Sequence, residues 1–239
     1  GPPRNAPARF PMTRRSILVR LRDGNDADRS EAFRVLTAGY WQPISTYIRI
    51  AHRRDPDAAD DLTQSFFGAA WIKSFFSSYD PERARFRTFL RLCVDRFVLR
   101  QAEAERTLKR GGETILTSLE AGNEHPDPAD PIDQDVLFHQ EFVRSLFTRS
   151  VDRLQRELEG RGKHVTFALF DRYDLDSAAD ASYASLAAEF GLSESTVTNQ
   201  LHAARRRFRE IVLDDLRELA VTEEEFRVDA AQILGIEAP

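Results

Sequence analysis

The sequence predicts an all-α protein made of two small helical domains that are joined by an acidic linker. Apolar residues recur at helical intervals along most of the chain, and no series of segments alternates apolar and polar residues as β-strands do. With 239 residues, of which 41% are hydrophobic, the chain is long enough to bury one large core or two small ones. A change of composition near the middle of the chain favours two.

The domain boundaries are predicted from composition. Residues 1–13 are rich in proline and arginine, so we expect a disordered arm or the remnant of a tag outside the fold. The first domain is predicted at 14–110. The linker, 111–135, has three prolines, three glycines and no lysine or arginine, and is expected to be extended. The second domain is predicted at 136–218, and a C-terminal extension follows at 219–239.

Helices account for most of the first domain. Apolar residues occur at helical spacing in EAFRVLTAGY and WQPISTYIRIAHRR, where Pro43 is expected to kink the helix or to begin a new one. A further helix, with Asp57 as its candidate N-cap, is predicted in DPDAADDLTQSFFGAAWIKSFF. The periodicity breaks in SSYDPERARFR, which is expected to be a loop. A basic helix is then predicted in TFLRLCVDRFVLRQAEAERTLKR.

The second domain also consists of helices in this prediction. One is expected in VLFHQEFVRSLFTRSVDRLQREL and another in HVTFALFDRY. The first of them carries an apolar stripe formed by Phe142, Leu146, Val151, Leu154 and Leu158. The C-terminal extension carries Leu216, Leu219, Phe226 and Ile233 and is expected to enlarge the helical core. Masking of the second domain and binding of a regulator are the alternatives for this extension.

A helix-turn-helix is predicted in SYASLAAEFGLSESTVTNQLHAARRRF. Gly191 suits the turn, and Ser193 can cap the second helix. An inward stripe is expected from Val197, Leu201, Ala204 and Phe208. Short polar side chains near the start of such a helix reach base edges in the major groove, and arginines further along bind phosphates. The second helix is therefore predicted to bind DNA, whereas the alternative, a solvated arginine face, leaves the turn, cap and stripe unexplained.

The charge of the chain is unevenly distributed. Its net charge is −5, yet residues 1–110 hold 21 Lys/Arg and 13 Asp/Glu, while residues 111–239 hold 13 Lys/Arg and 26 Asp/Glu. Such a basic half is typical of a surface that meets a polyanion.

The composition also points to a compartment. The single cysteine, Cys93, can form neither an intrachain disulfide nor a thiolate metal cluster, which fits a reducing cytoplasm. No apolar run approaches the roughly 20 residues that span a bilayer, and the first residues lack the core of a signal peptide. A soluble cytoplasmic protein without membrane insertion is expected.

No catalytic centre, metal site or cofactor site is predicted. Asp60 and Asp61 are adjacent and point about 100° apart on a helix, which makes a shared metal or an acid–base pair unfavourable. The histidines lack the i, i+4 pairing of a zinc helix. Gly111 and Gly112 lack the flanking lysine and hydroxyl residues of a phosphate-binding loop. The chain is expected not to be an enzyme.

Two segments of the chain resemble the extracytoplasmic-function (ECF) sigma factors of bacterial RNA polymerase. Conserved region two of that family is resembled by AADDLTQSFFGAAW together with RFRTFLRLCVDRFV. Region four is resembled by YASLAAEFGLSESTVTNQLHAARRRFRE. With the connecting helices, the resemblance covers most of residues 17–215. It implies an alternative sigma factor that binds the polymerase core, directs it to specific promoters and helps to open the DNA.

The resemblance also implies a role for particular residues. The acidic helix of region two docks on the clamp helices of the largest polymerase subunit, which assigns polymerase binding to Asp60, Asp61 and Gln64. The following loop and basic helix bind the minus-ten element and capture a flipped base, which assigns that contact to Arg85, Arg87, Phe89, Arg91, Arg96 and Arg100. Region four binds the polymerase flap and the minus-thirty-five element, the latter through Ser195, Thr196, Thr198, Asn199, His202, Arg205, Arg206 and Arg209.

Regulation and one other function remain open at this point. Thr63 lies within the acidic helix and is a candidate phosphorylation site, because phosphate would add about −1.5 to −2 charge there; a threonine that only packs or faces solvent is the alternative. A Ser/Thr kinase is therefore a candidate partner, and the resemblance adds an anti-sigma factor as another. The other function is a stand-alone helix-turn-helix regulator with a sensor or dimerisation domain.

Overall fold

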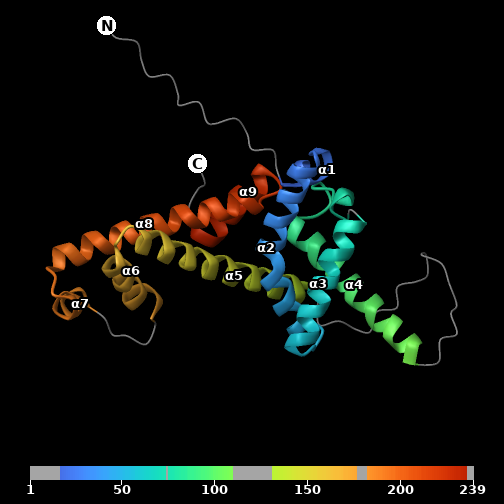
Figure 1. Ribbon diagram of the computed structural model, residues 1–239, viewed down its shortest axis with the longest axis horizontal. Coiled ribbons are helices and arrows are strands. Elements are labelled where there is room, and N and C mark those ends of the chain that lie inside the picture. Colours follow the sequence, from blue (N-terminus) through green and yellow to red (C-terminus); the bar gives the residue numbers. More distant parts are fainter. Residues whose placement is uncertain (1–16, 74, 110–130, 177–181, 236–239) are drawn as a thin grey trace, which may run out of the picture.

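The computed structural model describes residues 17–73, 75–109, 131–176 and 182–235. Every regular element in these ranges is a helix, as Figure 1 shows. The predicted all-α fold class is therefore confirmed for the part of the chain that the structure describes.

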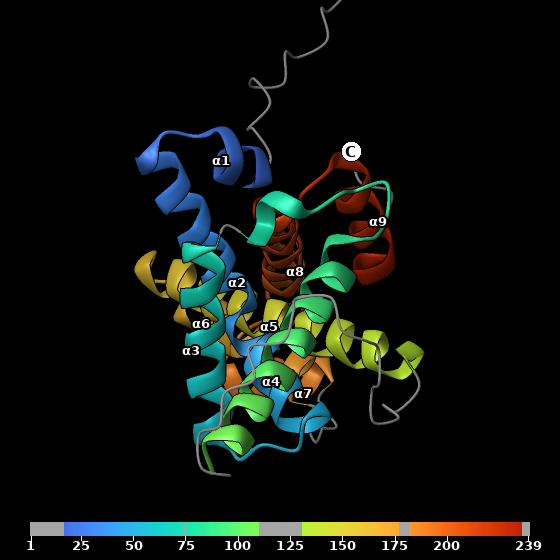
Figure 2. The ribbon, with the colours of Figure 1, turned by 90° about the vertical axis from the view of Figure 1, so that its right-hand side faces the viewer.

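Five helical elements form the described part of the N-terminal half. They are α1 (Ile17–Asp23), α2 (Asp26–Ala51), α3 (Pro56–Ile72), the 3₁₀ turn η1 (Phe75–Ser78) and α4 (Phe86–Lys109). Helix α2 packs against α1, α3 and α4, and the predicted loop separates η1 from α4. Figure 2 looks along the molecule towards these helices.

The start of α3 differs from the sequence prediction by its cap. The cap is Asp55, whose carboxylate accepts a hydrogen bond of 2.9 Å from the backbone N–H of Ala58. Asp57 instead lies in the first turn, where a negative charge is favourable. Pro56 follows the cap directly, at a position where the missing N–H would have no partner in the helix.

Helix α2 continues without interruption through Pro43. The expectation that Pro43 might begin a new helix is wrong, because one helix extends from Asp26 to Ala51. Proline removes one backbone hydrogen bond, but the surrounding Tyr40, Ile44 and Tyr47 are fully buried. The stability gained by burying these side chains offsets the loss of the hydrogen bond.

The C-terminal half contains two long helices that lie side by side (Figure 1). Its elements are α5 (Pro131–Gly160), α6 (His164–Phe170), the π-helical turn η2 (Asp171–Leu175), α7 (Tyr183–Phe190), α8 (Glu194–Leu219) and α9 (Glu223–Leu234). Helix α5 begins inside the segment predicted as linker. The rest of that segment, 111–130, and the predicted N-terminal arm lie outside the described residues.

Two hydrophobic cores lie towards opposite ends of the α5–α8 pair. The smaller core is built from α5 to α8 alone and contains Leu154, Leu158, Leu169, Phe170, Leu186, Ala187, Val197, Leu201, Ala204 and Ile211. The larger core joins α1 to α4 with the start of α5, the end of α8 and α9. The C-terminal half contributes Phe138, Phe142, Leu146, Val212, Leu216, Leu219, Val221 and Phe226 to it. The C-terminal extension thus enlarges the helical core, as its apolar residues predicted.

Helices α2 and α8 approach each other closely at Gly39. A Cβ atom at Gly39 would lie 2.3 Å from Cδ2 of Leu219, which is far inside van der Waals contact. Leu219 is itself buried. The absence of a side chain at Gly39 therefore allows the end of α8 to rest on α2.

We expect Gly39→Ala to lower the free energy of unfolding by about 1–3 kcal/mol, because the added methyl group overpacks the contact with Leu219. Gly68→Ala is the matched control: a Cβ at Gly68 in α3 would meet nothing within 4 Å. This control should stabilise the protein by about 0.5–1 kcal/mol through helix propensity. Urea unfolding followed by circular dichroism measures both, and equal values for the two variants would contradict a close contact at Gly39.

Candidate nucleic-acid interface

The helix-turn-helix consists of α7, a short turn and α8. Gly191 ends α7 in the left-handed conformation, with φ of 65° and ψ of 35°, which glycine adopts without strain. Ser193 then caps α8, because its hydroxyl accepts a hydrogen bond of 3.1 Å from the backbone N–H of Thr196. The predicted turn and cap are both confirmed.

The inner face of α8 holds the motif together. Val197, Leu201 and Ala204 are fully buried in the smaller core. Phe208 is partly buried, and its ring lies 5.7 Å from that of Phe147 and 5.5 Å from that of Phe170. The predicted inward stripe is therefore confirmed, and it fixes which side chains of α8 face outward.

Most of the outward residues of α8 are exposed. They include Ser195, Asn199, His202, Arg206 and Arg209, while Thr196, Thr198 and Arg205 are half-buried. The hydroxyl of Thr198 donates to the carbonyl of Glu194 at 2.8 Å, and that of Thr196 lies 2.8 Å from the hydroxyl of Ser193. A row of polar and positively charged groups thus lies on one side of the helix, opposite the buried stripe.

Arg205 is engaged within the protein. Its guanidinium pairs with Asp174 of η2 at 2.9 Å, donates to the hydroxyl of Tyr183 at 3.3 Å and lies 5.1 Å from the centre of the Tyr173 ring. The hydrogen bonds to Asp174 raise the pKa of Arg205 above its ordinary value. Arg205 therefore ties α8 to η2 and α7, which is a positioning role, although the sequence assigned it to phosphate.

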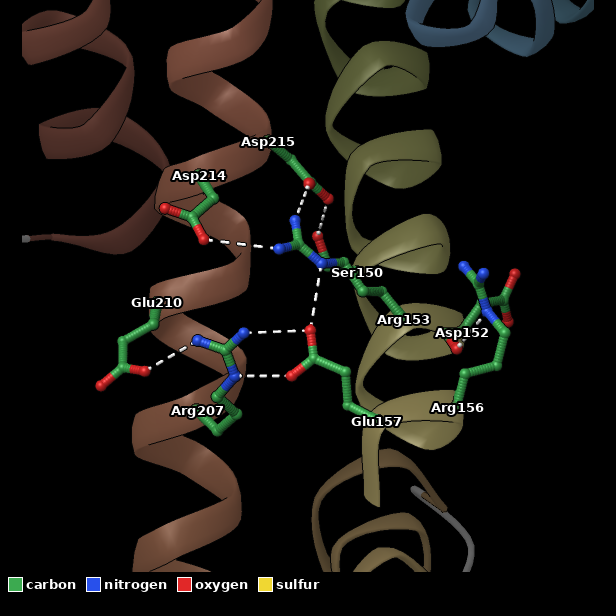
Figure 3. A network of polar contacts seen from close by, with 9 residues as sticks. All are labelled: Ser150, Asp152, Arg153, Arg156, Glu157, Arg207, Glu210, Asp214 and Asp215. Carbon is green, nitrogen blue, oxygen red and sulfur yellow. Dashed lines mark hydrogen bonds and ion pairs between the residues drawn. The ribbon is translucent and has the colours of Figure 1, made fainter. Parts of the chain in front are cut away.

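Arg207 points to the opposite side, towards α5, as Figure 3 shows. Its guanidinium donates to both carboxylate oxygens of Glu157, at 2.7 and 3.0 Å. One turn earlier in α5, Arg153 donates to Asp215 at 2.8 Å, and Asp215 also accepts from Ser150 at 3.0 Å. These charge-assisted contacts align α5 with α8 between the two cores. Of the arginines at 205–209, only Arg206 and Arg209 are exposed.

The basic helix α4 also divides its arginines between two faces. Arg85, just before the helix, is exposed, as are Arg96 and Arg100. Phe89 is half-buried, and its ring lies 5.2 Å from that of Tyr79. These residues form the outer side of the candidate minus-ten surface.

Arg87 and Arg91 lie on the inner side of α4. Arg87 donates from both terminal nitrogens to Asp229 of α9, one of them at 2.7 Å. Burial alone would lower the pKa of Arg87, but its hydrogen bonds to Asp229 and the nearby charges of Asp229 and Glu225 together raise it. Arg91 is only 4% exposed and pairs with Asp95 at 2.7 Å and with Asp135 of α5 at 2.6 Å. In this conformation the guanidinium groups of Arg87 and Arg91 are therefore both paired with carboxylates.

The acidic residues of α3 lie at the surface. Asp60, Asp61 and Gln64 are exposed, and Asp60 also accepts a hydrogen bond of 2.5 Å from the hydroxyl of Ser45 on α2. Thr63 on the same helix has no exposed surface, and its hydroxyl donates to the carbonyl of Ala59 at 2.8 Å. A kinase reaches this hydroxyl only if α3 opens locally, so the packing role fits Thr63 in this conformation.

Sequence reasoning missed the acidic partners of these arginines. Asp229 lies 142 residues from Arg87, and Asp174 lies 31 residues from Arg205. The acidic composition of the C-terminal half was the available signal, but composition does not assign partners. Within the described ranges, no group of three or more His, Cys, Asp or Glu side chains is arranged to hold a metal ion, and no helix combines the length and apolarity needed to cross a bilayer.

Comparison with known proteins identifies one matching family. The family model described as ECF sigma factor matches residues 15–214, which include both α3–α4 and the helix-turn-helix. No curated protein and no solved structure matches the chain.

The Glu157–Arg207 pair predicts a pH dependence of stability. Hydrogen bonding by Arg207 lowers the pKa of Glu157 below its ordinary value of 4.5, although burial opposes this. A carboxyl group whose pKa is depressed on folding contributes stability above its unfolded pKa and loses it as the pH falls through the folded pKa. Glu157→Gln should therefore lower the free energy of unfolding at neutral pH by about 1 kcal/mol.

The difference between Glu157→Gln and the wild type should shrink as the pH falls below the ordinary pKa of Glu157, since the wild-type carboxyl also becomes neutral there. Glu159→Gln on the same helix is the control, because the exposed Glu159 accepts from the neutral side chain of Gln155. Urea unfolding at a series of pH values measures the effect. A difference that stays constant down to pH values well below the ordinary pKa would contradict the ion pair.

Proposed function

Since this chain belongs to the ECF sigma factor family, it is an alternative sigma factor that acts in transcription initiation, and we propose that it binds the core of bacterial RNA polymerase and directs it to specific promoters. The family is one of non-enzymatic transcription factors, so bond formation in RNA synthesis belongs to the polymerase. The family match carries the class of function. The positions of individual side chains support the assignments that follow.

The exposed row on α8 supports recognition of the minus-thirty-five element. Ser195, Asn199 and His202 lie towards the start of α8, where a recognition helix reaches base edges in the major groove. Arg206 and Arg209 follow on the exposed side and can pair with phosphates. Arg205 is assigned to positioning, because its guanidinium already binds Asp174 and Tyr183.

The start and outer side of α4 support binding of the minus-ten element. Arg85, Arg96 and Arg100 offer exposed guanidinium groups for the backbone of the non-template strand. Extrusion of a base costs a few kcal/mol, and an aromatic ring such as that of Phe89 can recover part of this by stacking. Promoter opening is thus assigned to this end of the molecule.

The acidic face of α3 supports docking on the polymerase core. Asp61 and Gln64 are exposed, and among the described residues neither side chain is seen to form a hydrogen bond. Asp60 combines exposure with a hydrogen bond to Ser45 that fixes its side chain. A stand-alone regulator, the other function considered, does not account for a family match that spans both the acidic helix and the recognition helix.

The proposed function is tested by transcription with purified bacterial core polymerase, this protein and a library of promoter fragments. We expect promoter-specific transcripts that depend on the protein. Asp61→Lys should reduce both the transcripts and the affinity for core enzyme at least tenfold, which corresponds to about 1.4 kcal/mol, because the reversed charge faces the partner. Glu159→Lys, the same change of charge on exposed α5, is the control.

Two outcomes of this experiment would count against the proposal. If the protein binds DNA alone but neither joins core enzyme nor starts transcripts, the stand-alone regulator becomes the better assignment. If transcripts form and Asp61→Lys behaves like Glu159→Lys, α3 is removed from the docking site.

The two neighbouring arginines of α8 should respond differently to substitution. Arg206→Ala should weaken binding of the holoenzyme to its promoter and reduce the slope of log affinity against log salt by about 1, because one phosphate contact is lost. Arg205→Ala should chiefly lower the melting temperature of the free protein, and Asp174→Asn should do the same. A salt slope that responds to Arg205→Ala and not to Arg206→Ala would reverse the two roles.

A further inference from the structure

The C-terminal helix α9 contacts the start of the candidate minus-ten helix through two carboxylates. Oε1 of Glu225 accepts hydrogen bonds from the backbone N–H of Phe86 at 2.6 Å and from the hydroxyl of Tyr79 at 3.1 Å. Asp229, one turn later, binds the guanidinium of Arg87 with both oxygens. Figure 2 shows α9 beside the first turns of α4.

Both carboxylates occupy positions where an anion is favoured. Phe86 is the first residue of α4, and the N–H groups of a first helical turn have no partner within the helix. A phosphate or a carboxylate satisfies such groups equally well. A planar guanidinium such as that of Arg87 likewise binds carboxylate or phosphate through two parallel hydrogen bonds. Glu225 and Asp229 thus use the same donors that a nucleic-acid backbone would use.

Helix α9 packs on the larger core through Phe226, Ile233 and Leu234, and a cavity lies beside it. Phe226 is 2% exposed, and the guanidinium of Arg217 lies over its ring, 3.9 Å from the ring centre. A cavity of about 370 Å³ lies between α9 and the start of α4, and its lining includes Arg85, Arg87 and Val228. A helix whose packing leaves such a space forgoes dispersion contacts and separates at lower cost than a fully packed one.

The start of α5 provides a second acidic contact on the same side of α4. Asp135 and Gln134 bind the guanidinium of Arg91, one turn after Arg87. Arg87 and Arg91 are the two inward arginines of α4 that the family resemblance assigns to DNA. Residues of the C-terminal half thus bind both of them. The exposed Arg96 and Arg100 have no such cover in the described structure.

We propose that α9 is an intramolecular competitor of promoter DNA, in which Asp229 and Glu225 hold the anion-binding groups at the start of α4 until α9 is displaced. The inference rests on the proposed function, because it takes α4 as a DNA-binding helix. Free protein is then held in a closed form, and only the open form offers Arg87 to a phosphate. The apparent affinity for DNA is lowered by the fraction of molecules that is open.

The test compares the affinity of purified full-length variants for a fluorescein-labelled single-stranded DNA oligonucleotide, measured by fluorescence anisotropy at low salt. Asp229→Asn removes the charge and keeps the shape, and Glu225→Gln does the same at the helix start. If either change moves the closed form from about nine-tenths to about half of the molecules, affinity rises about fivefold. Glu224→Gln is the matched control, because Glu224 is exposed and its substitution removes the same single negative charge from α9.

The gain must depend on Arg87. The double variant Arg87→Ala, Asp229→Asn should show no gain over Arg87→Ala alone. An equal rise for Glu224→Gln and Asp229→Asn would reduce the effect to general charge and overturn the competition. So would unchanged affinity in both Asp229→Asn and Glu225→Gln, whether or not the wild type binds the oligonucleotide.

A second measurement uses only the wild-type protein and is independent of how well the variants fold. Hydrogen exchange of the amides at 223–234 should become faster when the oligonucleotide is added in excess, because DNA displaces α9. Amides that stay equally protected with DNA bound would overturn the proposal.

The transcription assay with core polymerase decides the proposed function separately. If promoter-specific transcripts form but neither the DNA affinity of the variants nor the hydrogen exchange of α9 changes, only the proposed competition is refuted. Absence of any dependent transcript would refute the proposed function itself.

Discussion

The continuity of α8 is the constraint on which the arrangement of the protein depends. This helix has 26 residues and, at 1.5 Å per residue, is about 39 Å long. Its first turns carry the proposed recognition surface over the smaller core, and its last turns enter the larger core through Val212, Leu216 and Leu219. Because one helix belongs to both cores, the recognition surface is fixed relative to α1–α4 as long as the end of α8 stays seated on α2 at Gly39.

Arginine has several different roles in this protein, and burial decides between them. Arg207 and Arg153 align α5 with α8, and Arg205 fixes η2 against the recognition helix. Arg206 and Arg209 instead lie on the exposed side of α8. Charged pairs that are partly shielded from water are stronger than exposed pairs, so the inward arginines contribute to the fold while the exposed ones remain available for phosphates.

Acidic residues of the C-terminal half pair with basic residues of α4 in the N-terminal half. Asp229 and Glu225 reach α4 from α9, and Asp135 reaches it from α5, so the basic helix is paired with carboxylates along its inner side. The contact that completes the larger core is thus the same one that covers candidate DNA-binding groups. Stability of the free protein and access to α4 are coupled through this contact, since both depend on where α9 lies.

Local patterns were sufficient for the sequence to determine most of the helices, the turn at Gly191, the cap at Ser193 and the buried stripe of α8, because each depends on residues within a few positions of one another. The outward direction of Arg206 and Arg209 follows from the same periodicity. The cap at Asp55 and the continuous helix through Pro43 depend on local competition and packing that periodicity does not resolve. Only the tertiary structure decided which arginines remain free, because the partners of Arg87 and Arg205 are distant in sequence and become neighbours when the helices pack.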